Sequence, residues 1–120
     1  MKIYNKKISN KSLPFIIAEI GINNNGNINN AFKLIDYAAA AKCDAVKFQT
    51  INVNKLMVSN TPLAKYQKKT KFKNMNDLIN KYNFEYSDFI KVKNYCKKKN
   101  IIFFPNPFDI KRAIFLNKIN

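Results

Sequence analysis

The chain has 120 residues, a net charge of +15 and 47% hydrophobic residues, with 10 Phe and 6 Tyr. This composition supports a packed core and argues against disorder, and the length suits one small domain. No apolar run approaches the roughly 18 residues of a membrane span, and the lysine-rich N-terminus lacks the apolar core of a secretory signal. We therefore expect a cytoplasmic protein without a membrane partner, in which the isolated Cys43 and Cys96 stay reduced.

The positive charge has two interpretations, a nucleic-acid partner or a small anionic ligand. The chain has 22 basic residues against 7 acidic ones, but Arg112 is its only arginine. Arginine dominates specific contacts to bases and phosphates, so a nucleic-acid partner is the weaker interpretation. A small anionic substrate would gain from the same positive field.

In chain order, the first elements expected are a short strand or hairpin over residues 1–14 and a strand over 15–20. The second of these, FIIAEI, is a continuous apolar run with one acid near its end, which is typical of strands buried on both faces. A turn-rich loop over residues 21–27 follows, with the strong turn dipeptide Asn25-Gly26.

A helix should come next, capped by Asn27 or Asn29 and ending near Ala41. Apolar residues recur at steps of three or four along it and predict its buried stripe. They are Ile28, Ala31, Ile35, Ala38 and Ala41.

Residues 44–50 predict a second strand, with Ala45, Lys47 and Gln49 on one side and Val46 and Phe48 on the other. Residues 51–73 form a long polar insertion with one helical turn expected near 63–69. Loops of this length in compact domains are usually functional or mobile.

A short helix over residues 75–82 precedes a longer one, capped by Ser87 and running to about Lys99. Asn100 suits the left-handed position that ends such a helix. The longer helix should bury one face, consisting of Phe89, Val92 and Cys96.

Residues 101–104 predict a third strand, which we expect Pro105-Asn106-Pro107 to break. Asp109 can then cap a last helix over residues 110–116. The alternating order of strands and helices predicts an α/β fold with a parallel sheet. Periodicity alone leaves open a doubly wound sheet or a barrel.

Candidate site residues fall at the C-terminal ends of the strands, where parallel α/β folds place their ligands. Glu19 ends the first strand, Lys47 and Gln49 share one side of the second, and Asn106 and Asp109 follow the third. We expect the side chains of residues 19, 47 and 49 to converge at the mouth of the sheet. Lysine suits a phosphate or carboxylate, and the glutamine amide suits sugar hydroxyls.

Each candidate also has a structural alternative. Glu19 and Lys47 could be a purely structural ion pair, because a buried acid and a buried lysine must be paired. Lys47 and Gln49 could simply face solvent, and Asn106 could be only a turn residue. The chain has no histidine, which excludes histidine catalysis and histidine metal ligands within it.

Four segments in order resemble the sialic acid synthase family. Residues 16–23 are similar to its AEIGINHNG motif and residues 44–50 to its DAVKFQT motif. Residues 63–70 resemble a segment of its second βα loop, and residues 95–109 its third strand and STPFD turn.

The resemblance implies a (β/α)₈ TIM barrel that condenses phosphoenolpyruvate with an N-acetylated amino sugar, such as N-acetylmannosamine, to a nine-carbon 2-keto sugar acid. It implies a homodimer and a divalent metal, manganese or magnesium, whose ligands belong to later strands. By the same resemblance, Glu19 lines the catalytic centre, Lys47 binds phosphoenolpyruvate and Gln49 contacts the sugar. Asn106 stands where a phosphoenolpyruvate-binding hydroxyl is usual, and Asn24 replaces the motif histidine.

A complete barrel needs about 250 residues. We therefore expect residues 1–120 to be the N-terminal part of a synthase barrel, its first three βα units, without the later strands and the C-terminal antifreeze-like domain. We expect such a part to be inactive alone, and either poorly soluble or dependent on a partner, because it leaves strand edges unpaired. The alternatives are a remnant or binding module that has lost catalysis and, less probable on the arginine count, a nucleic-acid-binding domain.

Overall fold

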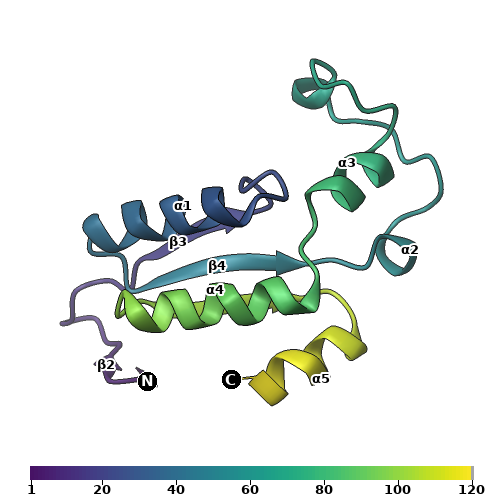
Figure 1. Ribbon diagram of the computed structural model, residues 1–120. Helices are drawn as coiled ribbons and strands as arrows, with labels where there is room; N and C mark the ends of the chain where they lie inside the picture. The colour runs from purple at the N-terminus through teal and green to yellow at the C-terminus, as the bar shows by residue number, and fades with distance from the viewer. Residues whose placement is uncertain (120) are drawn as a thin grey trace.

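The computed structural model describes residues 1–119 of the protein. Its first element is an antiparallel hairpin of two short strands, β1 (Lys2–Ile3) and β2 (Lys6–Lys7), as the sequence predicts. Lys6 ties this hairpin to the sheet, because its Nζ lies 2.7 Å from Oδ1 of Asp44. The hairpin lies at one end of the sheet, and residues 53–82, which we call the arm, project from the opposite end (Figure 1).

The centre of the molecule is a parallel sheet of three strands in the order β3–β4–β5. The strands are β3 (Ile17–Gly21), β4 (Ala45–Thr50) and β5 (Ile102–Pro107). Helix α1 (Ile28–Ala40) connects the first two strands, and α4 (Tyr86–Lys98) leads into the third. The predicted α/β fold with a parallel sheet is therefore confirmed.

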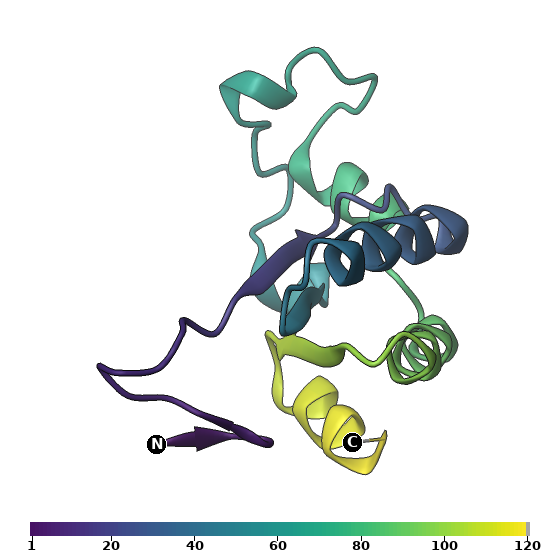
Figure 2. The same cartoon turned by 90° about the vertical axis from the view of Figure 1, so that its left-hand side faces the viewer.

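The two long helices pack side by side and cover the same face of the sheet (Figure 2). Val46 pairs with Ala18 on one side and with Phe103 on the other, and the core forms between this row and the helices. The predicted buried faces are confirmed: Ala31, Ile35 and Ala38 in α1, and Phe89, Val92 and Cys96 in α4. Ala41 was expected in the stripe of α1 but is exposed, because the helix ends one residue before it.

Local signals set the ends of α1. The side chain of Asn27 accepts hydrogen bonds from the backbone N–H groups of Asn29 and Asn30, so Asn27 is the N-cap. After the helix, Lys42 adopts a positive φ of 58°, a conformation that glycine adopts at far lower cost. Asn100 takes the same conformation after α4, with a φ of 55°, as predicted.

Two predictions about the second half of the chain are wrong. Ser87 does not cap α4, because the helix already begins at Tyr86 and its N-cap is Glu85. Strand β5 is not broken at Pro105-Asn106-Pro107 but runs to its last residue in register with β4. A strand at the edge of a sheet tolerates proline, because the missing N–H can fall on the side without a partner.

The arm has a small core of its own. The arm consists of α2 (Val53–Leu56), the 3₁₀ turn η1 (Lys65–Gln67) and α3 (Met75–Tyr82). Helix α3 and the helical turn near 63–69 agree with prediction, whereas α2 was not predicted. The buried residues of this second core are Ile51, Val53, Leu78 and Ile79.

The last helix, α5 (Ile110–Ile119), begins as predicted after Asp109, whose Oδ1 accepts a hydrogen bond from Arg112 N at 3.0 Å. That bond and the nearby guanidinium hold the pKa of Asp109 below its usual range.

Among the described residues, every helix is too short or too polar to cross a lipid bilayer. Both cysteines are free thiols, and burial raises the pKa of Cys96 to about 12.

Candidate functional site

Glu19 and Lys47 lie opposite each other on neighbouring strands. They are register partners in β3 and β4, and Oε2 of Glu19 lies 2.6 Å from Nζ of Lys47. Val46 and Phe48 point into the core, so Lys47, which lies between them in β4, points to the face that α1 and α4 leave uncovered. The acid and the amine are therefore presented together on the open face of the sheet.

This ion pair adds little to the stability of the fold. The side chain of Lys47 is 29% exposed and that of Glu19 is 48% exposed. Ion pairs with this access to water contribute roughly 0 to 1 kcal/mol. A purely structural pair and a binding site both predict the contact, so the roles of Glu19 and Lys47 stay predictions.

Gln49 continues the same side of β4, two residues beyond Lys47. A Cβ placed on Gly21 would lie 3.6 Å from both Oε1 of Glu19 and Cδ of Gln49. The carboxylate and the amide thus border one small space, which stays open because residue 21 has no side chain. Gly21 also has a φ of 55°, beside a register shift in β3. The acid, the amine and the amide converge, as the sequence predicts.

Asn106 is brought to this group by β5. Its Cα is the register partner of Gln49, and its carbonyl oxygen accepts a hydrogen bond of 3.1 Å from Oγ1 of Thr50. It is a strand residue rather than the turn residue of the structural alternative. Its place beside Gln49 puts an amide at the predicted position, and a role in binding substrate stays a prediction.

Asp109, the other candidate after the third strand, lies with Arg112 at the start of α5. Its Oδ2 lies 3.4 Å from Nη1 of Arg112, and its side chain is only 7% exposed. The carboxylate of Asp109 therefore caps α5 and pairs with Arg112. It does not join the group formed by Glu19, Lys47 and Gln49.

Asn24 organises the loop that follows β3. It is buried, and its Oδ1 accepts a 2.8 Å hydrogen bond from the backbone N–H of Gly26. Gly26 has a φ of 68°, and a Cβ there would approach the carbonyl oxygen of Lys81 to 2.6 Å. This loop therefore packs directly on the end of α3 and fixes the arm against the strand ends.

A cleft of about 510 Å³ opens between the arm, the loop after β3 and the strand ends. Gln49 belongs both to its lining and to the side of β4 that carries Lys47. Apolar and aromatic side chains make up most of the remaining wall, among them Met57, Leu78, Ile79 and Tyr82. These residues were not predicted as site residues. The signal was the apolar spacing of α3 at residues 75, 78, 79 and 82, a stripe that the main core does not use.

Within residues 1–119, no group of three or more His, Cys, Asp and Glu residues lies together in a way that could hold a metal ion. Glu19, the one acid at the strand ends described above, is already paired with Lys47. These residues do not by themselves form a metal site, and no step of the chemistry is assigned to a metal here.

A parallel α/β sheet with charged and amide groups gathered at its strand ends is the arrangement by which α/β enzymes bind small ligands. The comparisons with known proteins agree with that class. The sequence profile of the NeuB family matches residues 34–120, which is more than half of the chain. The chain belongs to the NeuB family.

Its relatives include biosynthetic synthases. It is 35% identical over 106 residues to the N,N'-diacetyllegionaminic acid synthase of Campylobacter jejuni, a match that covers 87% of this chain and 32% of that protein. It is 34% identical over 102 residues to the spore coat polysaccharide biosynthesis protein SpsE of Bacillus subtilis, covering 85% of this chain and 27% of that protein. The chain thus spans about a third of the length of these relatives.

The fold agrees with a solved relative. The crystal structure of the N-acetylneuraminic acid synthetase of Leptospira borgpetersenii superposes with a TM-score of 0.83 at 34% identity, over 100% of this chain and 38% of that one. The predicted family and the predicted α/β fold with a parallel sheet are therefore confirmed.

Proposed function

We propose that this chain provides the first strands and part of the active site of a synthase that condenses phosphoenolpyruvate with an N-acetylated amino sugar. A carbon–carbon bond forms between C3 of phosphoenolpyruvate and the aldehyde carbon of the sugar. Water supplies the new oxygen at C2, and phosphate leaves. The product is a nine-carbon 2-keto sugar acid for glycan biosynthesis. The convergence of Glu19, Lys47 and Gln49 on one face of the sheet is the observation that carries this proposal.

Each group has a role that follows from its chemistry. The Lys47 ammonium binds the anionic end of phosphoenolpyruvate as a point charge. Glu19 holds that ammonium in place across the 2.6 Å contact. The amides of Gln49 and Asn106 donate and accept hydrogen bonds at the sugar and at the phosphoenolpyruvate.

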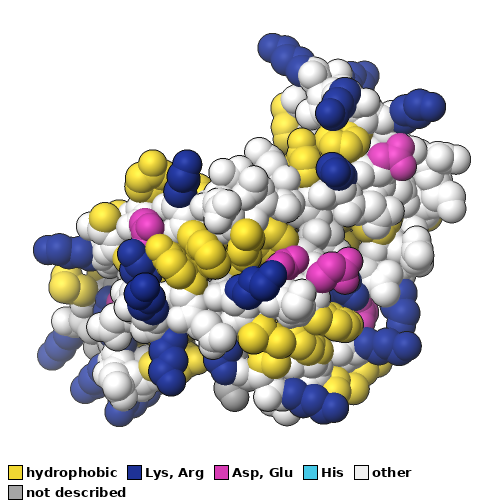
Figure 3. All heavy atoms as spheres, in the orientation of Figure 1, with side chains coloured by type: hydrophobic (Ala, Val, Ile, Leu, Met, Phe, Trp, Pro, Cys, Tyr) yellow, Lys and Arg dark blue, Asp and Glu magenta, His cyan; other side chains and the backbone are white. Residues whose placement is uncertain are grey.

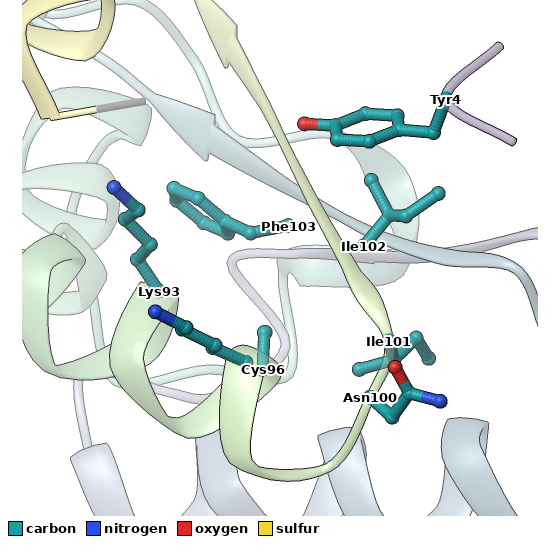
Figure 4. A pocket seen from close by; sticks show the side chains of 8 residues that line it. Tyr4, Lys93, Cys96, Asn100, Ile101, Ile102 and Phe103 are labelled. Atoms are coloured by element: carbon teal, nitrogen blue, oxygen red, sulfur yellow. The ribbon is translucent and has the colours of Figure 1, made fainter.

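The sheet is the opening part of a (β/α)₈ barrel in this proposal, and its open face is the barrel interior. A hollow of about 360 Å³ lies beside β5, lined by Cys96, Ile101, Ile102, Phe103 and others (Figure 4). A further βα unit would cover these apolar groups and pair with the edge of β5. The divalent metal and the homodimer that the resemblance implies belong to that complete enzyme and stay predictions.

The test is binding of phosphoenolpyruvate to the chain, measured by calorimetry with Lys47→Ala as the variant. Lys91→Ala is the matched control, since Lys91 is also a lysine paired to a carboxylate, at 3.0 Å, but lies on α4. We expect Lys47→Ala to weaken binding by about tenfold, because one charge-assisted contact is lost. Binding that is equal in both variants, or absent in the unmodified chain, would favour a remnant that has lost catalysis.

A further inference from the structure

The parallel sheet has two outer edges within residues 1–119, one at β3 and one at β5. The edge at β5 is unusual because this strand contains Pro105 and Pro107, and proline has no backbone N–H to donate. An edge strand offers its unpaired N–H and C=O groups to any other strand that approaches it. The side to which each proline turns therefore decides what this edge can bind.

The hydrogen bonds to β4 show which residues of β5 face the open edge. Ile102 N donates to Asp44 O at 3.0 Å. Farther along, Phe108 N donates to Thr50 O at 3.4 Å, and the carbonyl oxygen of Asn106 accepts from Oγ1 of Thr50 at 3.1 Å. In a strand, the N–H and C=O groups of one residue point to the same side, and those of the next residue point to the opposite side. The even-numbered residues of β5 therefore face β4, and the odd-numbered residues face the open edge.

The open edge of β5 thus has three carbonyl groups but a single donor. Residues 103, 105 and 107 are Phe, Pro and Pro, so only Phe103 has an N–H to offer there. By contrast, β3 contains no proline, and its outer edge keeps both donors and acceptors. The two edges therefore differ in chemistry: β3 can form a full ladder with another strand, whereas β5 mainly accepts hydrogen bonds.

A second copy of this chain fits the β5 edge poorly. In a symmetric dimer through two β5 edges, each copy would bring the same row of carbonyl groups. Carbonyl groups would then face carbonyl groups along most of the edge, and an acceptor without a donor is costly once water is excluded. Pairing of β5 with the β3 edge of another copy would leave carbonyl groups of β3 without donors at Pro105 and Pro107.

We propose that Pro105 and Pro107 protect the open edge of β5 against the addition of a second copy of this chain. The edge admits a strand that donates N–H groups to the carbonyl groups of residues 103, 105 and 107, such as the further βα unit of the proposed barrel. The β5 edge thereby stays available to that strand instead of extending the sheet with copies of the same chain. This protection depends on the backbone of β5 and not on the substrate of the proposed function.

Self-association of the full chain tests the protection. The variant Pro105→Ala/Pro107→Ala restores the two missing donors. Pro14→Ala/Pro62→Ala is the matched control, because it makes the same change at the two prolines that lie outside the sheet. Sedimentation velocity over a range of concentrations should show at least about tenfold tighter self-association in the β5 variant, because two more hydrogen bonds per copy become available. The control should behave as the unmodified chain.

Amide hydrogen exchange, followed by NMR, tests the direction in which the prolines face. It is measured in Pro105→Ala at a concentration at which the chain is monomeric. The amide introduced by the substitution should exchange at least about a hundredfold faster than those of Phe104 and Asn106, because it faces solvent while they are bonded to β4.

Two results would overturn the proposal. One is equal self-association in the β5 variant, the control and the unmodified chain. The other is an introduced amide that is as well protected in the monomer as that of Asn106, because the prolines would then not face the open edge. Binding of phosphoenolpyruvate that depends on Lys47 would be untouched by either result, so the proposed function stands or fails separately.

Discussion

Glu19 is the residue whose two interpretations differ most in their consequences. As a structural partner it would stabilise the sheet through Lys47, and as a site residue it would hold the ammonium for an anionic substrate. Its carboxylate is 48% exposed and 2.6 Å from the amine, so the stability at stake is small. Binding and turnover therefore distinguish the interpretations better than stability does.

The variant Glu19→Gln should separate affinity from turnover. Removing the negative charge beside Lys47 strengthens binding of phosphoenolpyruvate by several-fold, because the anion no longer competes with a carboxylate. The melting temperature should stay within about 2 °C of the unmodified chain, and turnover in a completed enzyme should fall. Calorimetry and a thermal melt measure these effects, with Asp88→Asn as a charge-matched control on α4. Affinity and turnover that are both unchanged in Glu19→Gln would remove Glu19 from the site.

At the scale of elements, the ends of α1 and α4 illustrate how well a sequence predicts helix boundaries. Asn27 and Asn100 were assigned from local chemistry, because caps and left-handed positions depend on one residue and its near neighbours. Ser87 was assigned in the same way and was wrong, because an equally local alternative, Glu85, begins the helix. Local signals predict which helices and strands form, but they predict poorly which of two nearby residues caps a helix.

The strand β5 and the cleft depend on contacts that the sequence does not state. Pro105 and Pro107 argue against a strand, and only the pairing with β4 keeps them in one. The convergence of Glu19, Lys47 and Gln49 was predictable, since parallel strands bring their ends to one edge. The cleft was not predictable, because the apolar spacing of α3 does not show which surface that helix packs against.

The left-handed residue after α1 gives an element-scale prediction. Lys42→Gly should raise the free energy of unfolding by about 1 kcal/mol, because glycine adopts a positive φ without the steric cost of a Cβ. Asn100→Gly should gain less, since asparagine tolerates this conformation better than lysine. Denaturant unfolding of the two variants measures the difference. A loss of stability in Lys42→Gly would show that a contact of the lysine side chain stabilises the fold by more than the positive φ costs.

The clamp between the hairpin and the sheet predicts a pH dependence. The hydrogen bond from Lys6, and then that from Ile16 N, holds the pKa of Asp44 below its ordinary value of 3.8. The stabilisation is therefore complete above that value and is lost as the pH falls below it towards the folded-state pKa. Melting temperatures measured from about pH 7 down to about pH 2 should show Asp44→Asn destabilised at neutral pH and converging with the unmodified chain in acid.

Lys6→Gln serves as the companion variant, because it removes the larger cause of the lowered pKa. In a chain that carries Lys6→Gln, the effect of Asp44→Asn on the melting temperature should depend less on pH. A difference between Asp44→Asn and the unmodified chain that stays constant with pH would mean that the carboxylate acts through its shape and not through its charge.

At the scale of the whole molecule, the positive charge should guide an anionic substrate. Lysine side chains gather at the outer end of the arm (Figure 3), where Lys65, Lys68 and Lys69 are exposed. Affinity for phosphoenolpyruvate should fall roughly threefold to tenfold between about 50 and about 500 mM salt. Changing these three lysines to glutamine should reduce that dependence, measured by calorimetry at several salt concentrations. Duplex DNA that binds more tightly than phosphoenolpyruvate at every salt concentration would favour the nucleic-acid interpretation instead.

The central proposal is that Glu19, Lys47 and Gln49, at the C-terminal ends of β3 and β4, form part of the active site of a synthase. The most direct measurement replaces the aligned region of the Campylobacter jejuni synthase, 32% of that protein, with this chain and follows phosphate release from phosphoenolpyruvate together with formation of N,N'-diacetyllegionaminic acid. We predict that the chimaera is active, that Lys47→Ala reduces its turnover by at least about a hundredfold, and that Lys91→Ala leaves it unchanged. A folded chimaera that keeps full activity with Lys47→Ala, or that is inactive even without it, would contradict the account.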